Sequence, residues 1–226
     1  MTPIKKSRLA GITYLTTVLT VLFSLMYVPN KQIELDNIAT TVLNIRDHRG
    51  LFASGVISEL LCYIALLILP LVLYPSLKKH NLSLAKIMVS LVLVAAPISC
   101  LTVVYKINIL SFLNDPNMKA DQIQTLTSIS FKSYHNTTRV ASIFWGLCLI
   151  PFGYLGYTSG HIPKVLAVFL IIGGLGYQIN FIGYLLMPEF NQTIIPRIAK
   201  IPSSIGEIGT CLWLLIVGMK KEGKYV

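Results

Sequence analysis

The chain has 226 residues, of which 54% are hydrophobic and only 12% are charged, and its mean hydropathy is +0.69. A soluble domain carries about twice that charged fraction, so the composition excludes an ordinary soluble globular protein. The formal net charge of +10 does not indicate nucleic-acid binding, because the basic residues cluster at the ends of apolar runs and no basic face with interleaved aromatic residues lies outside them.

Six apolar segments reach or nearly reach the ~20 residues that an α-helix needs to cross the hydrocarbon core of a bilayer. We therefore predict an all-α, polytopic transmembrane helical bundle with six spans, which forms a single domain over residues 1–226. Prolines interrupt the second, third and fourth segments, where a kink or a tilt is expected. The predicted spans are 9–28, 51–74, 87–113, 140–157, 165–187 and 203–219.

Short and long connectors alternate along the chain. The short links 75–86 and 158–164, together with both termini, hold ten Lys and Arg residues in about 35 residues. The long links 29–50, 114–139 and 188–202 hold eight Lys and Arg in about 60 residues, and also six acids. Since basic residues concentrate on the cytoplasmic side of membrane proteins, we predict that both termini are cytoplasmic and that the long links lie outside.

Two of the long links contain apolar residues at three- and four-residue steps, the spacing typical of an amphipathic helix. In residues 32–45 these are Ile33, Leu35, Ile38, Val42 and Ile45, and a similar set occupies residues 119–134. We predict that both segments are amphipathic helices at the outer membrane interface or over the end of the bundle. The alternative is a partly ordered connector.

Polar and charged residues recur at one depth within the predicted spans. A charged side chain costs about 2.5–3.5 kcal/mol at the centre of a membrane helix, so each of these residues needs an explanation. Glu59 lies about 12 Å and Lys106 about 10 Å from the outer ends of their spans at 1.5 Å per residue, and Glu207 lies about one turn into the sixth span. The complete set, all in the outer half of the bilayer, is Glu59, Lys106, Arg139, Gln178, Asn180 and Glu207.

This set has several interpretations. The residues could join the helices through buried ion pairs and amide hydrogen bonds. Alternatively they form an outward-facing polar pocket that binds a lipid or a small amphiphile, and we expect this ligand-binding function. A secondary transporter or proton-coupled carrier is a further class, and an intramembrane enzyme that uses Glu59 or Glu207 as acid or base is another. A non-catalytic partner protein is also compatible with the sequence.

The remaining chemistry-bearing residues show no ligand spacing. The four cysteines lie singly in apolar runs and are expected to be buried free thiols. The four histidines, His48, His80, His135 and His161, have no metal-binding spacing and are expected to be interfacial. No nucleophile elbow, phosphate loop or HExxH motif occurs, so we expect neither a catalytic residue of those types nor a cofactor or metal.

Glycine-rich motifs in the fourth and fifth spans resemble a bacterial multipass membrane-protein family catalogued as domain of unknown function 4386. The motifs are Trp145-Gly146-Leu147, Gly153-Tyr154-Leu155 and Gly173-Gly174-Leu175-Gly176-Tyr177, with Arg8-Leu9-Ala10-Gly11 near the start and Gly206-Glu207 near the end. The resemblance covers almost the whole chain. It implies a multipass protein of the bacterial cytoplasmic membrane, surrounded by membrane lipids, and it implies no activity. Many relatives carry His at the position of Cys148, so any function of that His is not implied here.

Overall fold

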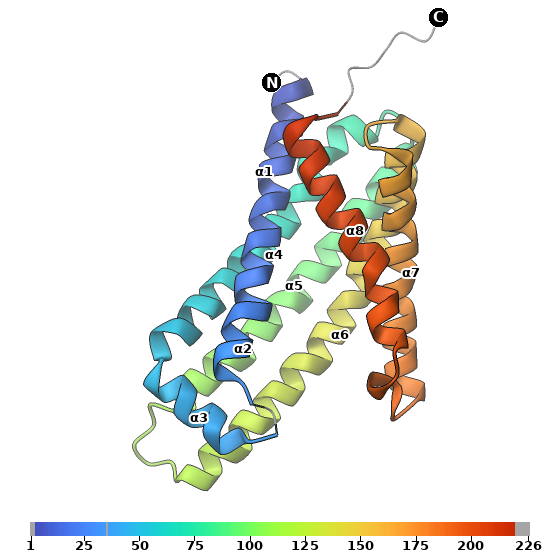
Figure 1. Ribbon diagram of the computed structural model, residues 1–226. Coiled ribbons are helices and arrows are strands. Elements are labelled where there is room, and N and C mark those ends of the chain that lie inside the picture. The colour runs from blue at the N-terminus through green and yellow to red at the C-terminus, as the bar shows by residue number, and fades with distance from the viewer. Residues whose placement is uncertain (1–2, 35, 220–226) are drawn as a thin grey trace, which may run out of the picture. The chain divides into compact units, whose positions relative to one another are not determined.

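The computed structural model describes residues 3–34 and 36–219, with side chains from residue 7 onward. These residues form helices and short connectors, with no strand among them (Figure 1). Helices α4 (Arg49–Leu77), α5 (Leu82–Phe112) and α7 (Lys164–Leu186) cover the second, third and fifth predicted spans. The first span is covered by α1 (Pro3–Val21), a π-helical stretch η1 (Leu22–Tyr27) and α2 (Val28–Gln32). Helices α4 and α5 continue through their internal prolines.

Within residues 3–34 and 36–219, five helical segments are long and apolar enough to cross a membrane. They are Ser7–Gln32, Arg49–Leu77, Leu82–Phe112, Ala120–Ser159 and Lys164–Leu186. Their composition is that of an integral membrane protein. Large apolar side chains remain exposed along them, for example Ile57, Leu93, Leu101 and Leu185, as expected of surfaces that face lipid.

The fourth predicted span differs most from the structure. Residues 119–134 do not form a separate connector helix, because helix α6 runs without interruption over Ala120–Ser159, a length of 40 residues. At 1.5 Å per residue this helix is about 60 Å long, roughly twice the thickness of the hydrocarbon core. Helix α6 is therefore longer than a single membrane crossing requires, and its polar first half continues the helix beyond its apolar second half.

Helix α8 (Ile195–Ile216) begins eight residues before the sixth predicted span. Pro196 in its first turn is compatible with helix initiation, because the missing N–H would have no partner there. The helix then continues through Pro202. Glu207 consequently lies near the middle of α8 rather than one turn from its start.

The predicted helix over residues 32–45 is shorter in the structure. Helix α3 spans Ile38–Asp47, and the Asn37 side chain caps it by accepting a hydrogen bond from the Thr40 N–H at 3.1 Å. The preceding segment is fixed by Gln32, whose amide donates to the His48 carbonyl at 2.9 Å. Leu35, part of the predicted pattern, lies outside the described residues.

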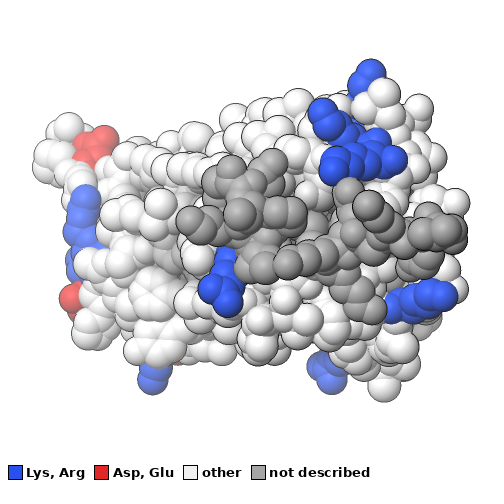
Figure 2. Space-filling view, turned by 90° about the horizontal axis from the view of Figure 1, so that it is seen from above, with Lys and Arg blue, Asp and Glu red and all other residues white. Residues whose placement is uncertain are grey.

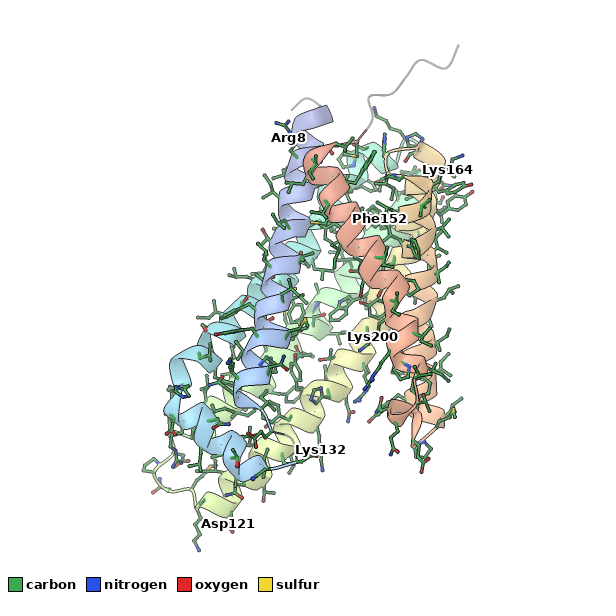
Figure 3. All side chains as sticks on the ribbon, in the orientation of Figure 1. Arg8, Asp121, Lys132, Phe152, Lys164 and Lys200 are labelled. Atoms are coloured by element: carbon green, nitrogen blue, oxygen red, sulfur yellow. The ribbon has the colours of Figure 1, made fainter. Side chains whose placement is uncertain are left out.

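The chain divides into two compact units. Unit 1 comprises Met1–Leu15, Ala65–Ala96 and Val140–Val226, and unit 2 comprises Thr16–Ile64 and Pro97–Arg139. The core of unit 1 contains fully buried Leu77, Met88, Leu155, Leu170 and Leu214, and the core of unit 2 contains Ile45, Phe52, Cys62 and Ile109. Figure 3 shows Phe152, also in the core, among the side chains of unit 1.

One end of unit 1 is basic. Figure 3 shows Arg8 and Lys164 at this end. Figure 2 is the view from above, and it shows several Lys and Arg side chains in blue on the surface. Lys78, Lys79 and Lys86 are also exposed in the two short links and their flanks. Five of the ten basic residues used in the orientation argument thus have described, exposed side chains, whereas Lys5, Lys6, Lys220, Lys221 and Lys224 lie outside the described side chains.

Candidate functional site

In unit 2, Glu59 of α4 and Lys106 of α5 form a buried ion pair. Lys106 Nζ lies 2.6 Å from Glu59 Oε2, and the two residues are only 4% and 1% exposed. The other carboxylate oxygen, Oε1, accepts hydrogen bonds from the hydroxyls of Tyr63 at 2.6 Å and Tyr134 at 2.9 Å. Every oxygen of the Glu59 carboxylate is therefore bonded.

Helical spacing explains how these groups meet. Glu59 and Tyr63 are four residues apart on α4, and Thr102 and Lys106 are four residues apart on α5, so each pair lies on one helix face. The Thr102 hydroxyl lies 3.3 Å from Glu59 Oε1 but has a shorter bond, 2.6 Å, to the Ser99 carbonyl. Because a hydroxyl has one proton, we count two hydroxyl donors and one ammonium donor at Glu59.

Lys106 is also held by an aromatic ring. Its Nζ lies 4.4 Å from the ring centroid of Tyr134, which is itself buried on α6. An ammonium over a tyrosine face is attracted by the ring quadrupole. Arg139, five residues further along α6, is half-buried and donates to Asn136 at 3.2 Å. The structure therefore brings two of the six predicted site residues, Glu59 and Lys106, together in a closed and electrically neutral network, which agrees with the alternative that such residues join the helices.

The other three predicted site residues, Gln178, Asn180 and Glu207, lie in unit 1. Glu207 of α8 is half-buried, and Tyr177 of α7 lies close to its carboxylate. Tyr14 of α1, only 4% exposed, lies within electrostatic range of Glu207 and Tyr177. Among the described side chains Glu207 forms no ion pair, in contrast to Glu59, which pairs with Lys106.

Two thiols line the same cluster. Cys148 of α6 and Cys211 of α8 lie within electrostatic range of Tyr14. The Cys148 thiol donates to the Met88 carbonyl at 3.6 Å, and the Cys211 thiol donates to the Gly11 carbonyl at 3.9 Å. Both thiols are buried and free, as the sequence predicted.

The two amides of α7 differ in their surroundings. Gln178 donates to the Ile143 carbonyl of α6 at 3.0 Å and thereby joins two helices. Asn180 has a buried amide whose nitrogen and oxygen have no hydrogen-bond partner among the described residues. It lies on the same α7 face as Gly176 and Gly183, which approach Ala199 and Phe190, so the amide is enclosed where α7 packs against α8 and the 3₁₀ turn Phe190–Gln192.

Glycines bring the helices of unit 1 close together. A Cβ built on Gly174 would lie 2.5 Å from the Gly146 carbonyl oxygen, and one on Gly153 would lie 2.6 Å from the Ala167 carbonyl oxygen. Gly173 approaches Ser203 in the same way, so α7 packs closely against both α6 and α8 (Figure 1). This packing sets the positions of Tyr177 and Glu207.

No group of three His, Cys, Asp or Glu side chains that could hold a metal occurs within residues 3–34 and 36–219. His80 and His161 instead form an edge-to-face ring pair with centroids 5.2 Å apart.

The sequence profile of the domain of unknown function DUF4386 matches residues 9–218. The chain belongs to the DUF4386 family. No curated protein and no solved structure matches it. The matched span of this DUF4386 member includes both polar clusters, the Glu59 network of unit 2 and the Glu207 cluster of unit 1.

Sequence reasoning did not select Tyr134, Thr102 or Tyr14 as site residues. The four-residue spacing of Thr102 and Lys106 was a usable signal for Thr102. Tyr14 and Tyr134 come from distant parts of the sequence, and only the packing of α1 and α6 within their respective units places them.

Proposed function

We propose that the protein is a six-span protein of the cytoplasmic membrane, with both termini in the cytoplasm, that binds a lipid or small amphiphile at Glu207. The observation that carries the proposal is that the Glu207 carboxylate can still pair with a cation or accept further hydrogen bonds. It lies in the middle of α8, close to Tyr177 of α7, and forms no ion pair with a described basic residue. A charged carboxylate within a membrane helix is costly unless a partner compensates it, and a ligand would supply such a partner.

The Glu59 network supports the proposal by contrast. Its carboxylate is neutralised by Lys106 and bonded at both oxygens, so neither its charge nor its acceptor oxygens are available to bind a ligand. Buried pairs of this kind between membrane helices join the helices. We therefore assign Glu59 and Lys106 to the scaffold and narrow the ligand site to unit 1.

Helix α8 has the features of a sixth crossing. Its 22 residues extend about 33 Å at 1.5 Å per residue, which matches a hydrocarbon core of about 30 Å. Exposed apolar side chains also follow one stripe at three- and four-residue steps, typical of a surface that faces lipid. They are Ile198, Ile201, Ile205, Ile208, Leu212 and Ile216.

The experiment is native mass spectrometry of the full chain, extracted into polymer nanodiscs and released into a mild detergent. We expect a retained adduct of lipid or amphiphile mass, whose occupancy falls about tenfold in Glu207→Gln, corresponding to ~1.4 kcal/mol. Asp121→Asn, an exposed acid in unit 2, is the matched control and keeps the adduct. Absence of any adduct on the wild type, or full occupancy in Glu207→Gln, would contradict the proposal.

A proton-coupled carrier is the second candidate. The π-helical stretch Leu22–Tyr27 and the prolines inside α4, α5, α6 and α8 interrupt regular helix hydrogen bonding, as in the broken helices of transporters. In this case the Glu59–Lys106 pair would accept and release the coupled proton. A pH-dependent flux in liposomes that Glu59→Gln abolishes would favour this function over binding alone.

A further inference from the structure

We propose that the basic end of unit 1 binds the headgroup of an anionic phospholipid. This end carries five exposed cations and is separate from Glu207, which lies nine residues before the last residue of α8, about 14 Å at 1.5 Å per residue. The two sites are independent, so either can be absent while the other holds. The five cations are Arg8, Lys78, Lys79, Lys86 and Lys164.

Nearby acids do not compensate the positive charge of this end. The cations lie in three stretches of the described chain, residues 7–15, 74–86 and 157–164, and none of these stretches contains an Asp or a Glu. The described acids of unit 1 are Glu189, in the link before α8, and Glu207, near the middle of α8. Because like charges gathered on one surface repel one another, a bound anion would lower the free energy of this end.

Two of the basic stretches are joined by side-chain contacts. The rings of His80 and His161 meet edge to face with centroids 5.2 Å apart, which joins the turn after α4 to the turn after α6. The indole of Trp213 in α8 donates to the His161 carbonyl at 3.0 Å. The lysines next to the two histidines, Lys78 and Lys79 in one stretch and Lys164 in the other, are thereby gathered beside the last turns of α8.

The third basic stretch, at the start of α1, is attached to the same helix. The Met219 N–H, shortly after α8 ends, donates to the Ser7 hydroxyl at 2.7 Å. This bond places Arg8, the next residue, at the same end of unit 1 as Lys164, as Figure 3 shows. The three stretches therefore form one basic surface, although they are far apart in the sequence.

Two of the ammonium groups lie over tyrosine rings at the ends of apolar helices. Lys78 Nζ lies 5.5 Å from the ring centroid of Tyr74, and Lys164 Nζ lies 5.2 Å from that of Tyr157. Tyrosine is enriched at the headgroup level of membrane proteins, and long cationic side chains extend their charge to the same level. The rings therefore hold these charges at the depth of lipid phosphates.

The surface next to these charges favours a lipid over a soluble anion. Leu82, the first residue of α5, is 50% exposed, and Val165, which follows Lys164, is 66% exposed. A phospholipid can pair its phosphate with the lysines and lay its acyl chains on such apolar side chains. Each lysine near a membrane surface strengthens the attraction to anionic lipid roughly fivefold, whereas a free phosphate gains from charge alone and is screened by salt.

The test is native mass spectrometry of the full chain, released from nanodiscs of equimolar phosphatidylglycerol and phosphatidylcholine. We expect the wild type to retain about tenfold more phosphatidylglycerol than phosphatidylcholine. The variant Lys78→Gln/Lys79→Gln/Lys164→Gln should retain the two lipids about equally. An adduct that Glu207→Gln removes and this variant keeps belongs to the other site.

A matched control removes three charges elsewhere. Lys119→Gln/Lys132→Gln/Lys200→Gln changes exposed lysines outside the three basic stretches and should keep the preference for phosphatidylglycerol. Equal retention of both lipids by the wild type would overturn the proposal. Equal loss of the preference in both triple variants would also overturn it, because net charge rather than this surface would then attract the lipid.

Two further measurements keep the test decisive. If the first triple variant does not fold, the single variant Lys79→Gln should lower the preference roughly threefold and Lys119→Gln should not, and equal effects would contradict the site. Dioctanoylphosphatidylglycerol added to the wild type in detergent should displace the retained phosphatidylglycerol, and glycerol phosphate at the same concentration should not. Displacement by glycerol phosphate would assign this end to a soluble phosphate and overturn the lipid.

Discussion

At the scale of single residues, removing either Glu59 or Lys106 leaves the charge of the other buried and unpaired. We expect Glu59→Gln to leave the Lys106 ammonium without its counter-charge and Lys106→Met to leave the carboxylate without its own, at a cost of about 3–5 kcal/mol in free energy of unfolding for each variant. The double variant Glu59→Gln/Lys106→Met removes both charges and should cost less than either single variant. Unfolding by SDS titration in mixed micelles measures all three.

Additive effects in the double variant would contradict the buried pair. Asp121→Asn serves as the reference for a charge change at an exposed position, where substitutions usually alter stability by less than about 0.5 kcal/mol.

For Asn180 we expect that removal of the polar group stabilises the protein instead. Its buried amide has no partner among the described residues, and such a group costs about 1–3 kcal/mol. Asn180→Leu, which keeps the number and branching of the side-chain heavy atoms, should therefore raise the free energy of unfolding. Gln178→Leu should lower it, because Gln178 donates to the Ile143 carbonyl of α6. Thermal unfolding of the two variants in one detergent compares neighbouring amides on one helix, and destabilisation by Asn180→Leu would show that this amide joins helices after all.

The sequence offered ion pairs between helices as one interpretation of the six polar residues, because a lone charge is not stable in an apolar bundle. The Glu59–Lys106 contact is of that kind, but the sequence did not specify which residues would pair or which hydroxyls would join them. The sequence contained no such signal to separate this satisfied pair from Glu207, since an acid's neighbours depend on tertiary packing. Whether all six predicted residues serve one ligand stays a prediction.

At the scale of helices, the contact of α7 with α8 depends on residues that lack a side chain. A Cβ on Gly173 would lie 2.5 Å from Ser203 Cα, a distance at which the helices must move apart. We expect Gly173→Ala to cost about 1–3 kcal/mol through overpacking, despite the higher helix propensity of alanine. SDS titration also measures this change.

Gly50 is the matched control for that substitution. It lies in the first turn of α4, and a Cβ built there meets nothing within 4 Å. Gly50→Ala should be neutral or should stabilise by up to about 1 kcal/mol. If both alanine variants were equally tolerated, the close packing of α7 on α8 would not hold.

Helix boundaries were predicted well where hydropathy and hydrogen bonding end together, as in α5 and α7. They were predicted poorly in α6 and α8, because a helix continues through polar sequence as long as its backbone hydrogen bonds are made. The polar stretch before Val140 and the segment before Ser203 are both helical. Hydropathy therefore located the apolar crossings but not the helices that contain them.

At the scale of the whole molecule, the number of crossings fixes the side of the C-terminus. Six crossings place both termini on the same side of the membrane, which the distribution of basic residues predicts to be the cytoplasmic side, and five crossings place them on opposite sides. We expect a green fluorescent protein fused to either terminus to fluoresce in bacteria, and an alkaline phosphatase fused at the C-terminus to be inactive. A phosphatase inserted after Asp115, in the second long link, should be active. An active C-terminal phosphatase would exclude α8 as a crossing.

The Glu59–Lys106 contact has a consequence for biogenesis. Helices α4 and α5 are consecutive and joined by the short turn between Leu77 and Leu82, and the apolar part of each carries one charge, Glu59 or Lys106, that costs about 2.5–3.5 kcal/mol on entering lipid. If the two helices leave the translocon together as a hairpin, the charges enter the bilayer already neutralised. The ion pair would then first lower the free-energy cost of inserting α4 and α5, before the remaining helices have been synthesised and can pack against them.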